Sequence, residues 1–417
     1  MRYDVVIIGG GLSALVCGIR LQRSGKSVLL VSSGQNAMHF SSGSFGFLGR
    51  LPDGSVPDSL IDAVQALPED HPYRKAGPDR LRAYAGQTIG FFESAGILLH
   101  GDPLHNSLRL TASGATKPAW LAMEDVTLFA SGEVPSGGKA LVVTLKGFTD
   151  FNAPFVASAF SRMGYTCRLE EVEMEEIASL RKNPTEMRSV NIARALEGQH
   201  VLDRFISCVR GKLKDEDTVV LPQVFGLKDT SPLAAIRSRI PAHVHFIGTM
   251  IPSVPGIRTQ MSLKSAFLSA GGTFLSGDTA VRAGFDGSGS VAAVFTSNLG
   301  KTPLEAGEFI LASGGLWGKG LDAKYDAVIE PLFSLDVDYP GERKQWYDPD
   351  FFARQSFTGF GVVTDDAFRA VKGGKTVPNL RVIGAECGGA NPLEEGSGAG
   401  IAIMSAFMAA DSILGSI

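Results

Sequence analysis

The first 34 residues alternate apolar runs with glycine in a pattern that predicts a strand, a tight turn, a helix and a second strand. The run Val5–Ile8 is apolar at every position, as expected for a parallel strand that is buried on both faces. Residues 12–23 spread apolar side chains over a broad helical face, and Gly25 ends that helix. The apolar run 27–31 completes a β–α–β unit.

Strand-like and helix-like patterns continue to alternate along the rest of the chain. Residues 58–99 are mainly helical in pattern, and a C-terminal helix opens near Gly398. The other expected strands cover residues 140–145, 167–172, 218–221, 244–247, 308–312 and 380–383, with helices over 153–163, 189–213 and 257–269 and a hairpin or meander over 273–298. We expect an α/β fold: a Rossmann-like domain of the FAD/NAD(P)-binding type (residues 1–111 and 251–417) with an inserted α/β domain for substrate or partner (residues 112–250).

The C-terminal segment 398–415 is apolar enough to suggest a membrane span, but we interpret it as a buried helix. It is short for a span and contains Asp411, Ser405 and Ser412. The N-terminus does not resemble a signal peptide, because Asp4 precedes the first apolar run and glycines end it.

The charge balance excludes a nucleic-acid-binding protein. The chain carries 39 Lys and Arg against 43 Asp and Glu, a net charge of −4. An anionic substrate must therefore be met by local arginines or lysines. The four cysteines are scattered without a CxxC pair, so we expect a reduced compartment and no metal or iron–sulfur site in this chain.

The segment Gly9-Gly10-Gly11-Leu12-Ser13-Ala14 fits the pattern G-x-G-x-x-[G/A] between a strand and a helix. Gly9 makes the tight turn, Gly11 lets phosphates approach backbone N–H groups, and Ala14 keeps the helix close to the strand. We therefore predict that the cofactor phosphate binds at Gly9, Gly11, Leu12, Ser13 and Ala14.

The usual ribose-binding acid at the end of the second strand is missing. Neither Asp nor Glu occurs between Asp4 and Asp53, and the strand ends in Ser32, Ser33 and Gly34. Ser32 is the candidate cofactor contact at this position.

Two further segments favour a flavin over a nicotinamide cofactor. A strand runs into Ser313 and Gly314, and another runs into Gly384 and Glu386 before the apolar helix at Gly398. Such a helix N-terminus suits the ribityl chain and the pyrimidine edge of a flavin. The Gly/Ser-rich loop over residues 35–54 is long for its position and adds the candidates His39, Ser41, Ser42 and Gly43.

The layout resembles the flavoproteins related to fumarate reductase and glycerol-3-phosphate dehydrogenase. Nearly end to end, the chain looks like the B subunits of anaerobic glycerol-3-phosphate dehydrogenases. The resemblance rests on RYDVVIIGGGLSALVCGIRLQRSG, HFSSGSFGFLGRLPDG, NPTEMRSVNIAR, VPGIR and the stretch from YDPDFFA to GVVTDD.

The resemblance implies an FMN cofactor, oxidation of sn-glycerol 3-phosphate to glycerone phosphate, and electrons passed to quinone in anaerobic respiration. It also implies an FAD-containing A subunit and an iron–sulfur C subunit that anchors the assembly peripherally at the cytoplasmic face of the inner membrane, this chain itself being soluble. FMN has no adenosine, which would explain the missing acid. The alternative is FAD with its ribose held by Ser32 or Ser33.

The candidate catalytic residues are His39, Arg188, Arg194 and Arg258. The basic segment 181–194 is the best anion-binding candidate, against the alternative of a solvated helix edge. His39 is a candidate base or an ordinary loop histidine, and Arg258 faces the ligand or the surface. Two other functions stay open: a stand-alone fumarate-reductase-like enzyme, and a subunit that relays electrons or serves assembly.

Overall fold

A computed structural model describes residues 1–130, 137–180 and 187–415. Its main sheet has the strand order β13-β2-β1-β16-β22-β21. The five strands from β13 to β22 are parallel and β21 is antiparallel to β22. Their bounds are β1 Arg2–Ile8, β2 Val28–Ser32, β13 Thr273–Ser276, β16 Glu305–Leu311, β21 Arg369–Lys372 and β22 Lys375–Val382. This is the predicted Rossmann-like arrangement, with β1 at the centre of the sheet.

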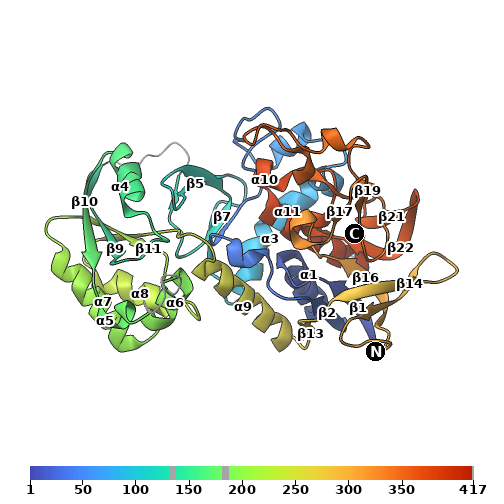
Figure 1. Ribbon diagram of the computed structural model, residues 1–417, viewed down its shortest axis with the longest axis horizontal. Coiled ribbons are helices and arrows are strands. Elements are labelled where there is room, and N and C mark those ends of the chain that lie inside the picture. Colours follow the sequence, from blue (N-terminus) through green and yellow to red (C-terminus); the bar gives the residue numbers. More distant parts are fainter. Residues whose placement is uncertain (131–136, 181–186, 416–417) are drawn as a thin grey trace.

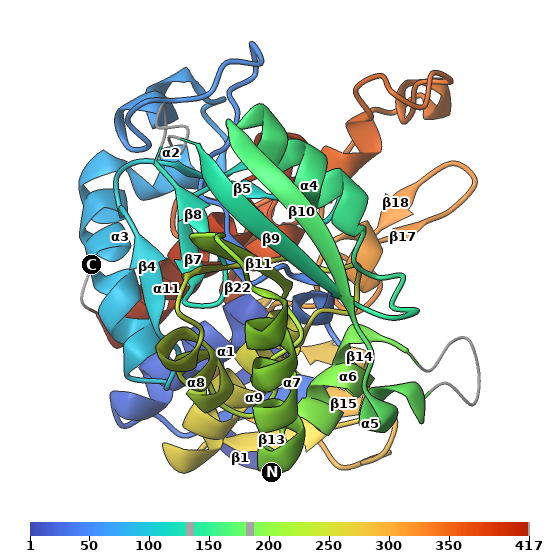
Figure 2. The same ribbon diagram turned by 90° about the vertical axis from the view of Figure 1, so that its left-hand side faces the viewer.

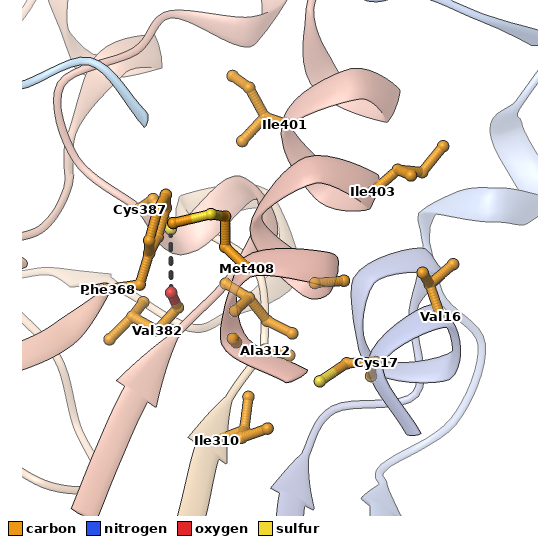
Figure 3. Close-up of a cluster of buried hydrophobic side chains, with 14 of the residues drawn as sticks. Val16, Cys17, Ile310, Ala312, Phe368, Val382, Cys387, Ile401, Ile403 and Met408 are labelled. Atoms are coloured by element: carbon orange, nitrogen blue, oxygen red, sulfur yellow. Dashed lines mark hydrogen bonds between the residues drawn. The ribbon is translucent and has the colours of Figure 1, made fainter. Parts of the chain in front are cut away.

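Two helices from opposite ends of the chain pack side by side on this sheet. Helix α1 (Leu12–Arg23) follows β1, and α11 (Gly398–Leu414) lies against it. Figure 3 shows Cys17 of α1 and Met408 of α11 in one apolar cluster above the ends of β16 and β22. Asp411 accepts two hydrogen bonds from Arg20, at 2.6 and 2.9 Å. Within the described residues, none of the helices has both the length and the apolar character needed to cross a bilayer.

A second lobe is built on its own parallel sheet, in the order β10-β9-β11-β12. Its strands are β9 Gly138–Leu145, β10 Tyr165–Val172, β11 Thr218–Pro222 and β12 His243–Ile247. Its helices are α4 Ala153–Arg162, α5 Glu175–Ala178, α6 Ser189–Leu196, α7 Gln199–Lys212 and α8 Ser231–Arg239. The lobe has a separate apolar core, which runs from Leu110 to Ile247. The exact division at residues 112 and 250 stays a prediction.

The chain passes between the lobes through short strands and helix α9 (Val254–Ser269), which lies between the two lobes in Figure 1. One small sheet joins β3, β7 and β4, and a second joins β6, β5 and β8. Their bounds are β3 Ser44–Phe45, β4 Leu99–Gly101, β5 Ser107–Leu110, β6 Thr116–Ala119, β7 Leu121–Met123 and β8 Leu128–Phe129.

Three of the predicted segments differ in the structure. Residues 273–298 are not one meander: β13 joins the main sheet, and only β14 (Ala280–Phe285) and β15 (Val291–Thr296) form a hairpin. Gly198 divides the helical stretch 189–213 into α6 and α7. Residues 58–99 contain α2 (Pro72–Ala76) and α3 (Pro78–Glu93) after a 3₁₀ turn.

The segment between β16 and β22 contains two short antiparallel strand pairs that the pattern did not predict. Their strands are β17 Asp322–Ala323, β18 Val328–Ile329, β19 Val337–Asp338 and β20 Gly361–Val362. The short helix α10 (Pro392–Glu395) follows β22 and precedes α11.

Candidate flavin and substrate site

The glycine turn after β1 leaves room beside a helix N-terminus. A Cβ at Gly9, where φ is +133°, would collide with the carbonyl oxygen of Ala312, and one at Gly10 would collide with the Ser32 side chain. A Cβ at Gly11 would have no neighbour within 4 Å. Gly11 is the N-cap of α1, no side chain caps it, and the first turn contains no acid. Backbone N–H groups beside open space can therefore hold a phosphate group.

The strand end after β22 touches this helix N-terminus. A Cβ at Gly384, where φ is +75°, would lie 2.5 Å from the Ser13 hydroxyl oxygen. The Gly384 N–H donates to Ser405 of α11 at 2.9 Å. Leu12 is half-buried and Ala14 is fully buried in the main core. The structure thus brings the predicted contacts at residues 9–14 and Gly384 into one place.

Glu386 links the ends of β16 and β22 and is fully buried. Its Oε2 accepts hydrogen bonds from Ser313 N (2.8 Å), Ser313 Oγ (2.7 Å) and Gly314 N (3.1 Å). No hydrogen-bond partner for Oε1 exists among the described residues. A buried oxygen of this kind needs a donor, and a cofactor hydroxyl group can supply one.

Burial raises the pKa of Glu386 to about 7, helped by the nearby Glu330 carboxylate and opposed by the Ser313 hydrogen bond. The folded pKa thus lies above the ordinary value of 4.5. Glu386 therefore stabilises the fold fully below pH 4.5, and this contribution is lost as the pH rises through 7. The loss amounts to about 3 kcal/mol at alkaline pH.

We expect Glu386→Gln to remove this pH dependence from the flavin-free protein. Its melting temperature should fall less between pH 5 and pH 8 than that of the parent chain, because the neutral amide does not titrate. The same change at exposed Glu342 serves as the control. Equal pH profiles for Glu386→Gln and the parent would contradict the assignment.

The end of β2 carries no free acid. Ser32 is buried and its hydroxyl group donates to Gly34 O at 3.2 Å, while the Asn36 side chain donates to Gly10 O at 2.8 Å. The acid that follows the neighbouring strand β13 is Asp278. Its two oxygens already accept from Thr279 N, Thr296 Oγ1, Ser297 Oγ and Asn298 N.

The loop that follows β2 runs from the glycine turn to the N-terminus of α9. Ser253, the N-cap of α9, donates its N–H to His39 O at 3.0 Å and its hydroxyl group to Ser41 O. Gly43 approaches Pro255 so closely that a Cβ would lie 2.6 Å from the Pro255 side chain. Ser42 shares a hydrogen bond of 2.9 Å with Ser44. His39 is half-buried.

The same loop then reaches the N-terminus of α11. Gly400 donates to Gly46 O at 2.8 Å, two residues after Gly398, and Gly49 donates to Glu395 O at 2.7 Å. The loop therefore passes the N-termini of α1, α9 and α11 in turn, which places His39, Ser41, Ser42 and Gly43 between them.

A buried pair that sequence reasoning missed fixes the start of α11. His71 Nδ1 accepts from Tyr73 N (3.0 Å), so Nε2 carries the ring proton and donates to Glu395 Oε2 at 3.2 Å. Glu395 also accepts from Asn391 N and Ser397 Oγ. Burial raises the pKa of Glu395, but these hydrogen bonds leave it below its ordinary value. Only the tertiary fold brings His71 here, since 324 residues separate it from Glu395.

Arg188 lies where the second lobe meets this loop. Its Nε is 3.1 Å from Asp150 Oδ2, and Nη2 donates to Ile251 O at 2.6 Å, two residues before Ser253. Within the described part of the chain, no contact to Nη1 is found, and 44% of the side chain is exposed. Burial raises the pKa of Asp150, and Arg188 opposes that rise. Asp150 follows β9 and was not a predicted site residue.

The structure separates the other two arginines from Arg188. Helix α6 begins at Ser189, and Arg194 is exposed and bonded to Asn191 Oδ1 at 3.0 Å. Arg258 is not on the surface: it is 3% exposed, 2.6 Å from the fully buried Asp125, and donates to Phe225 O and Gly226 O. Arg181, Lys182 and Thr185 lie outside the described residues. Catalytic roles for Arg194 and Arg258 stay predictions.

Arg258→Ala should destabilise the protein by about 3–5 kcal/mol, because it leaves the buried Asp125 carboxylate without its cation. Chemical denaturation of the flavin-free chain measures this directly. Replacing the exposed Arg194 should change the free energy of unfolding by less than about 0.5 kcal/mol. A stable Arg258→Ala protein would show that this ion pair contributes little to stability.

Comparisons with known proteins agree with this geometry. A family model described as an FAD binding domain matches residues 4–401. The B subunit of anaerobic glycerol-3-phosphate dehydrogenase from Yersinia enterocolitica is 37% identical, with 99% of this chain and 98% of that protein covered. Its counterpart from Vibrio cholerae is 34% identical over 99% of this chain and 97% of that protein.

The chain belongs to the family of anaerobic glycerol-3-phosphate dehydrogenase B subunits. It is thus a member of a flavin oxidoreductase family, as its sequence predicted. Among solved structures, the 3-ketosteroid Δ1-dehydrogenase of Sterolibacterium denitrificans is 12% identical, with a TM-score of 0.48 and full coverage of both chains.

The glycine turn at Gly9 to Gly11 lies inside the range of this chain that the FAD binding domain model matches. Over the described residues, His, Cys, Asp and Glu side chains nowhere gather in threes that could hold a metal ion. The candidate site thus consists of the glycine turn, the two strand ends, the loop 35–54 and Arg188.

Proposed function

We propose that this chain is the FMN-bearing subunit of a glycerol-3-phosphate dehydrogenase. With its companion subunits it oxidises sn-glycerol 3-phosphate to glycerone phosphate and passes the electrons to quinone. The observation that carries the proposal is the loop after β2, which begins beside the open glycine turn at Gly11 and contacts Ser253, two residues after the carbonyl group that Arg188 binds. The relatives of the chain are named as subunits of this enzyme.

The residues present fit a flavin. The N-terminus of α1 and Gly11 would hold its phosphate, the free Oε1 of Glu386 would accept from a ribityl hydroxyl group, and the N-terminus of α11 would face the pyrimidine edge. A bound flavin supplies a hydride acceptor for carbon C2 of the substrate.

The end of β2 supports FMN over FAD. An adenosine ribose is usually held by an acid there, whereas Ser32 already bonds Gly34 and Asp278 already accepts four hydrogen bonds. FAD is the second candidate, because the matched family is described as an FAD binding domain. Chromatography of the cofactor released by heat decides between them: FMN is expected, and FAD would overturn this part of the proposal.

Arg188 is the proposed phosphate clamp. Asp150 and the Ile251 carbonyl group hold its guanidinium group through Nε and Nη2, so Nη1 is left to bind phosphate oxygens. His39, on the same loop as Ser41, is the proposed acceptor of the substrate hydroxyl proton. The substrate would thus lie between the two lobes.

The companion subunits are an FAD-containing A subunit and an iron–sulfur C subunit, and the assembly is peripheral at the cytoplasmic face of the inner membrane. The relatives are named as B subunits, which supports an assembly of this kind.

An electron-relay function is the second candidate, since the structure gathers only one of the three predicted arginines at the site. Anaerobic addition of sn-glycerol 3-phosphate to the assembled subunits tests the main proposal. Bleaching of the visible flavin absorption is expected. A complex that keeps its full flavin absorption would contradict the proposed activity.

A further inference from the structure

The most exposed aromatic side chains of the molecule belong to one segment between β16 and β20. Trp317, Tyr325, Phe351 and Phe352 are between 75% and 92% exposed, more than any other large apolar side chain of the described residues. In Figure 2 the hairpin β17–β18 and the loop over residues 343–357 project on the same flank of the molecule. We call these four side chains the aromatic platform.

Hydrogen bonds within residues 348–355 fix the loop that carries Phe351 and Phe352. The Gln355 amide group donates to the carbonyl groups of Asp348, Asp350 and Ala353, and its oxygen accepts from Asp348 N at 3.0 Å. Asp350 accepts from Phe352 N at 2.9 Å. The loop that carries the two phenylalanines is therefore ordered in the free chain, which lowers the entropy lost on binding a partner.

Further contacts join the three segments that carry these side chains: the turn at Trp317, the hairpin β17–β18 and the loop over residues 343–357. Arg343 donates to the carbonyl groups of Lys324 and Tyr325, both at 2.7 Å, and its guanidinium carbon lies 5.6 Å from the Tyr325 ring centroid. The Trp317 ring lies 6.2 Å from that of Phe357. The hairpin β17–β18, the turn at Trp317 and the loop over residues 343–357 are thus joined by direct contacts.

The platform begins beside the proposed flavin site. Gly320 donates to Gly314 O at 2.7 Å, and this anchors the turn that carries Trp317. Gly314 and Ser313 are the residues that donate to Glu386. A protein bound at the platform would therefore contact the same turn that supports the cofactor contact.

The charge around the platform favours a protein over a membrane surface. Residues 317–357 carry seven Asp and Glu side chains outside the core against five Lys and Arg, while an eighth acid, Glu330, is buried. Anionic lipid headgroups attract basic clusters, so this balance disfavours them. Exposed aromatic side chains on an ordered loop are typical of the centres of protein interfaces.

We propose that the aromatic platform is the docking surface for a companion protein of the same dehydrogenase, one that exchanges electrons with the flavin of this chain. The inference rests on the proposed function, because that function requires companion subunits. The partner is expected to offer an apolar socket with basic residues at its rim, complementary to the acidic segment.

The experiment compares assembly of the parent chain, the double variant Phe351→Ser with Phe352→Ser, and Trp317→Ser with purified companion subunits. Both variants should bind at least tenfold more weakly by interferometry, with unchanged flavin absorption and melting temperature. Phe155→Ser, on α4 of the second lobe, is the matched control, since that ring is 54% exposed and remote in sequence.

Parent-like assembly of either variant would overturn the proposal. A second result would also overturn it. If the isolated parent chain binds vesicles of phosphatidylethanolamine and phosphatidylglycerol and the two variants do not, the platform is a membrane contact. Interferometry reports the binding of the companion subunits directly, so this readout does not depend on whether the complex oxidises substrate. A complex that assembles through the platform but is not reduced by substrate would refute the proposed activity alone.

Discussion

Replacing Gly9 by alanine should give a colourless and destabilised protein. The backbone at Gly9 has a φ of +133°, and an added Cβ would collide with the carbonyl oxygen of Ala312, which directly follows the neighbouring strand β16. The central strands β1 and β16 would have to separate at their carboxyl ends. We expect a loss of about 3 kcal/mol or more of unfolding free energy, together with loss of bound flavin, measured by denaturation and by flavin absorption.

Gly11→Ala separates cofactor binding from folding and is the matched control. The added methyl group meets no atom within 4 Å, and the φ of Gly11 is −80°. The flavin-free Gly11→Ala chain should therefore keep its stability, while the methyl group occupies the space proposed for the phosphate. Flavin affinity should fall by at least tenfold. Parent-like affinity in Gly11→Ala would remove this turn from the cofactor site.

Arg188→Ala should raise the KM for sn-glycerol 3-phosphate by roughly 100-fold in the assembled enzyme. Charge-assisted hydrogen bonds contribute about 1.5–3 kcal/mol each, and every 1.4 kcal/mol is a factor of ten. The change removes the guanidinium group held by Asp150 and Ile251 and leaves the buried Asp150 carboxylate without its cation. The melting temperature of the variant is therefore measured beside its KM, and the KM effect is taken from folded protein. Steady-state kinetics of the assembled subunits measure it.

Arg194→Ala is the control for Arg188, because Arg194 belongs to the same helix segment but is exposed and bonded to Asn191. Its kinetics should match those of the parent. Arg188→Lys should recover part of the affinity, since it restores the charge without the fork of N–H groups. Equal effects at Arg188 and Arg194 would point to a general loss of positive charge.

The sequence was sufficient to predict the glycine turn and the strands β1, β2, β16 and β22 of the main sheet, but not the places of β13 and β21. A strand, three glycines and an amphipathic helix are local signals, and the structure confirms them at β1, Gly9 to Gly11 and α1. The second parallel sheet was also predictable, because β9, β11 and β12 are short apolar runs between helices.

Contacts between distant segments were not predictable. His71 pairs with Glu395, and Arg258 pairs with Asp125, only because the fold brings these segments together. Asp150 carries a weak signal, since it closely follows a strand end where ligand contacts gather. The segment around Trp317 gives no such signal in the sequence, because strands of two residues are too short to show an alternation of apolar and polar positions.

The most direct test of the account follows the flavin of this chain alone. Two assembled complexes are prepared: one with flavin only on this chain and a flavin-stripped companion, the other with Gly11→Ala in this chain and a flavin-loaded companion. Both receive sn-glycerol 3-phosphate without oxygen. We predict rapid bleaching in the first complex, and much slower bleaching at low substrate concentration when Arg188 is replaced by alanine. Bleaching only in the second would contradict it, because substrate oxidation would then belong to the companion protein.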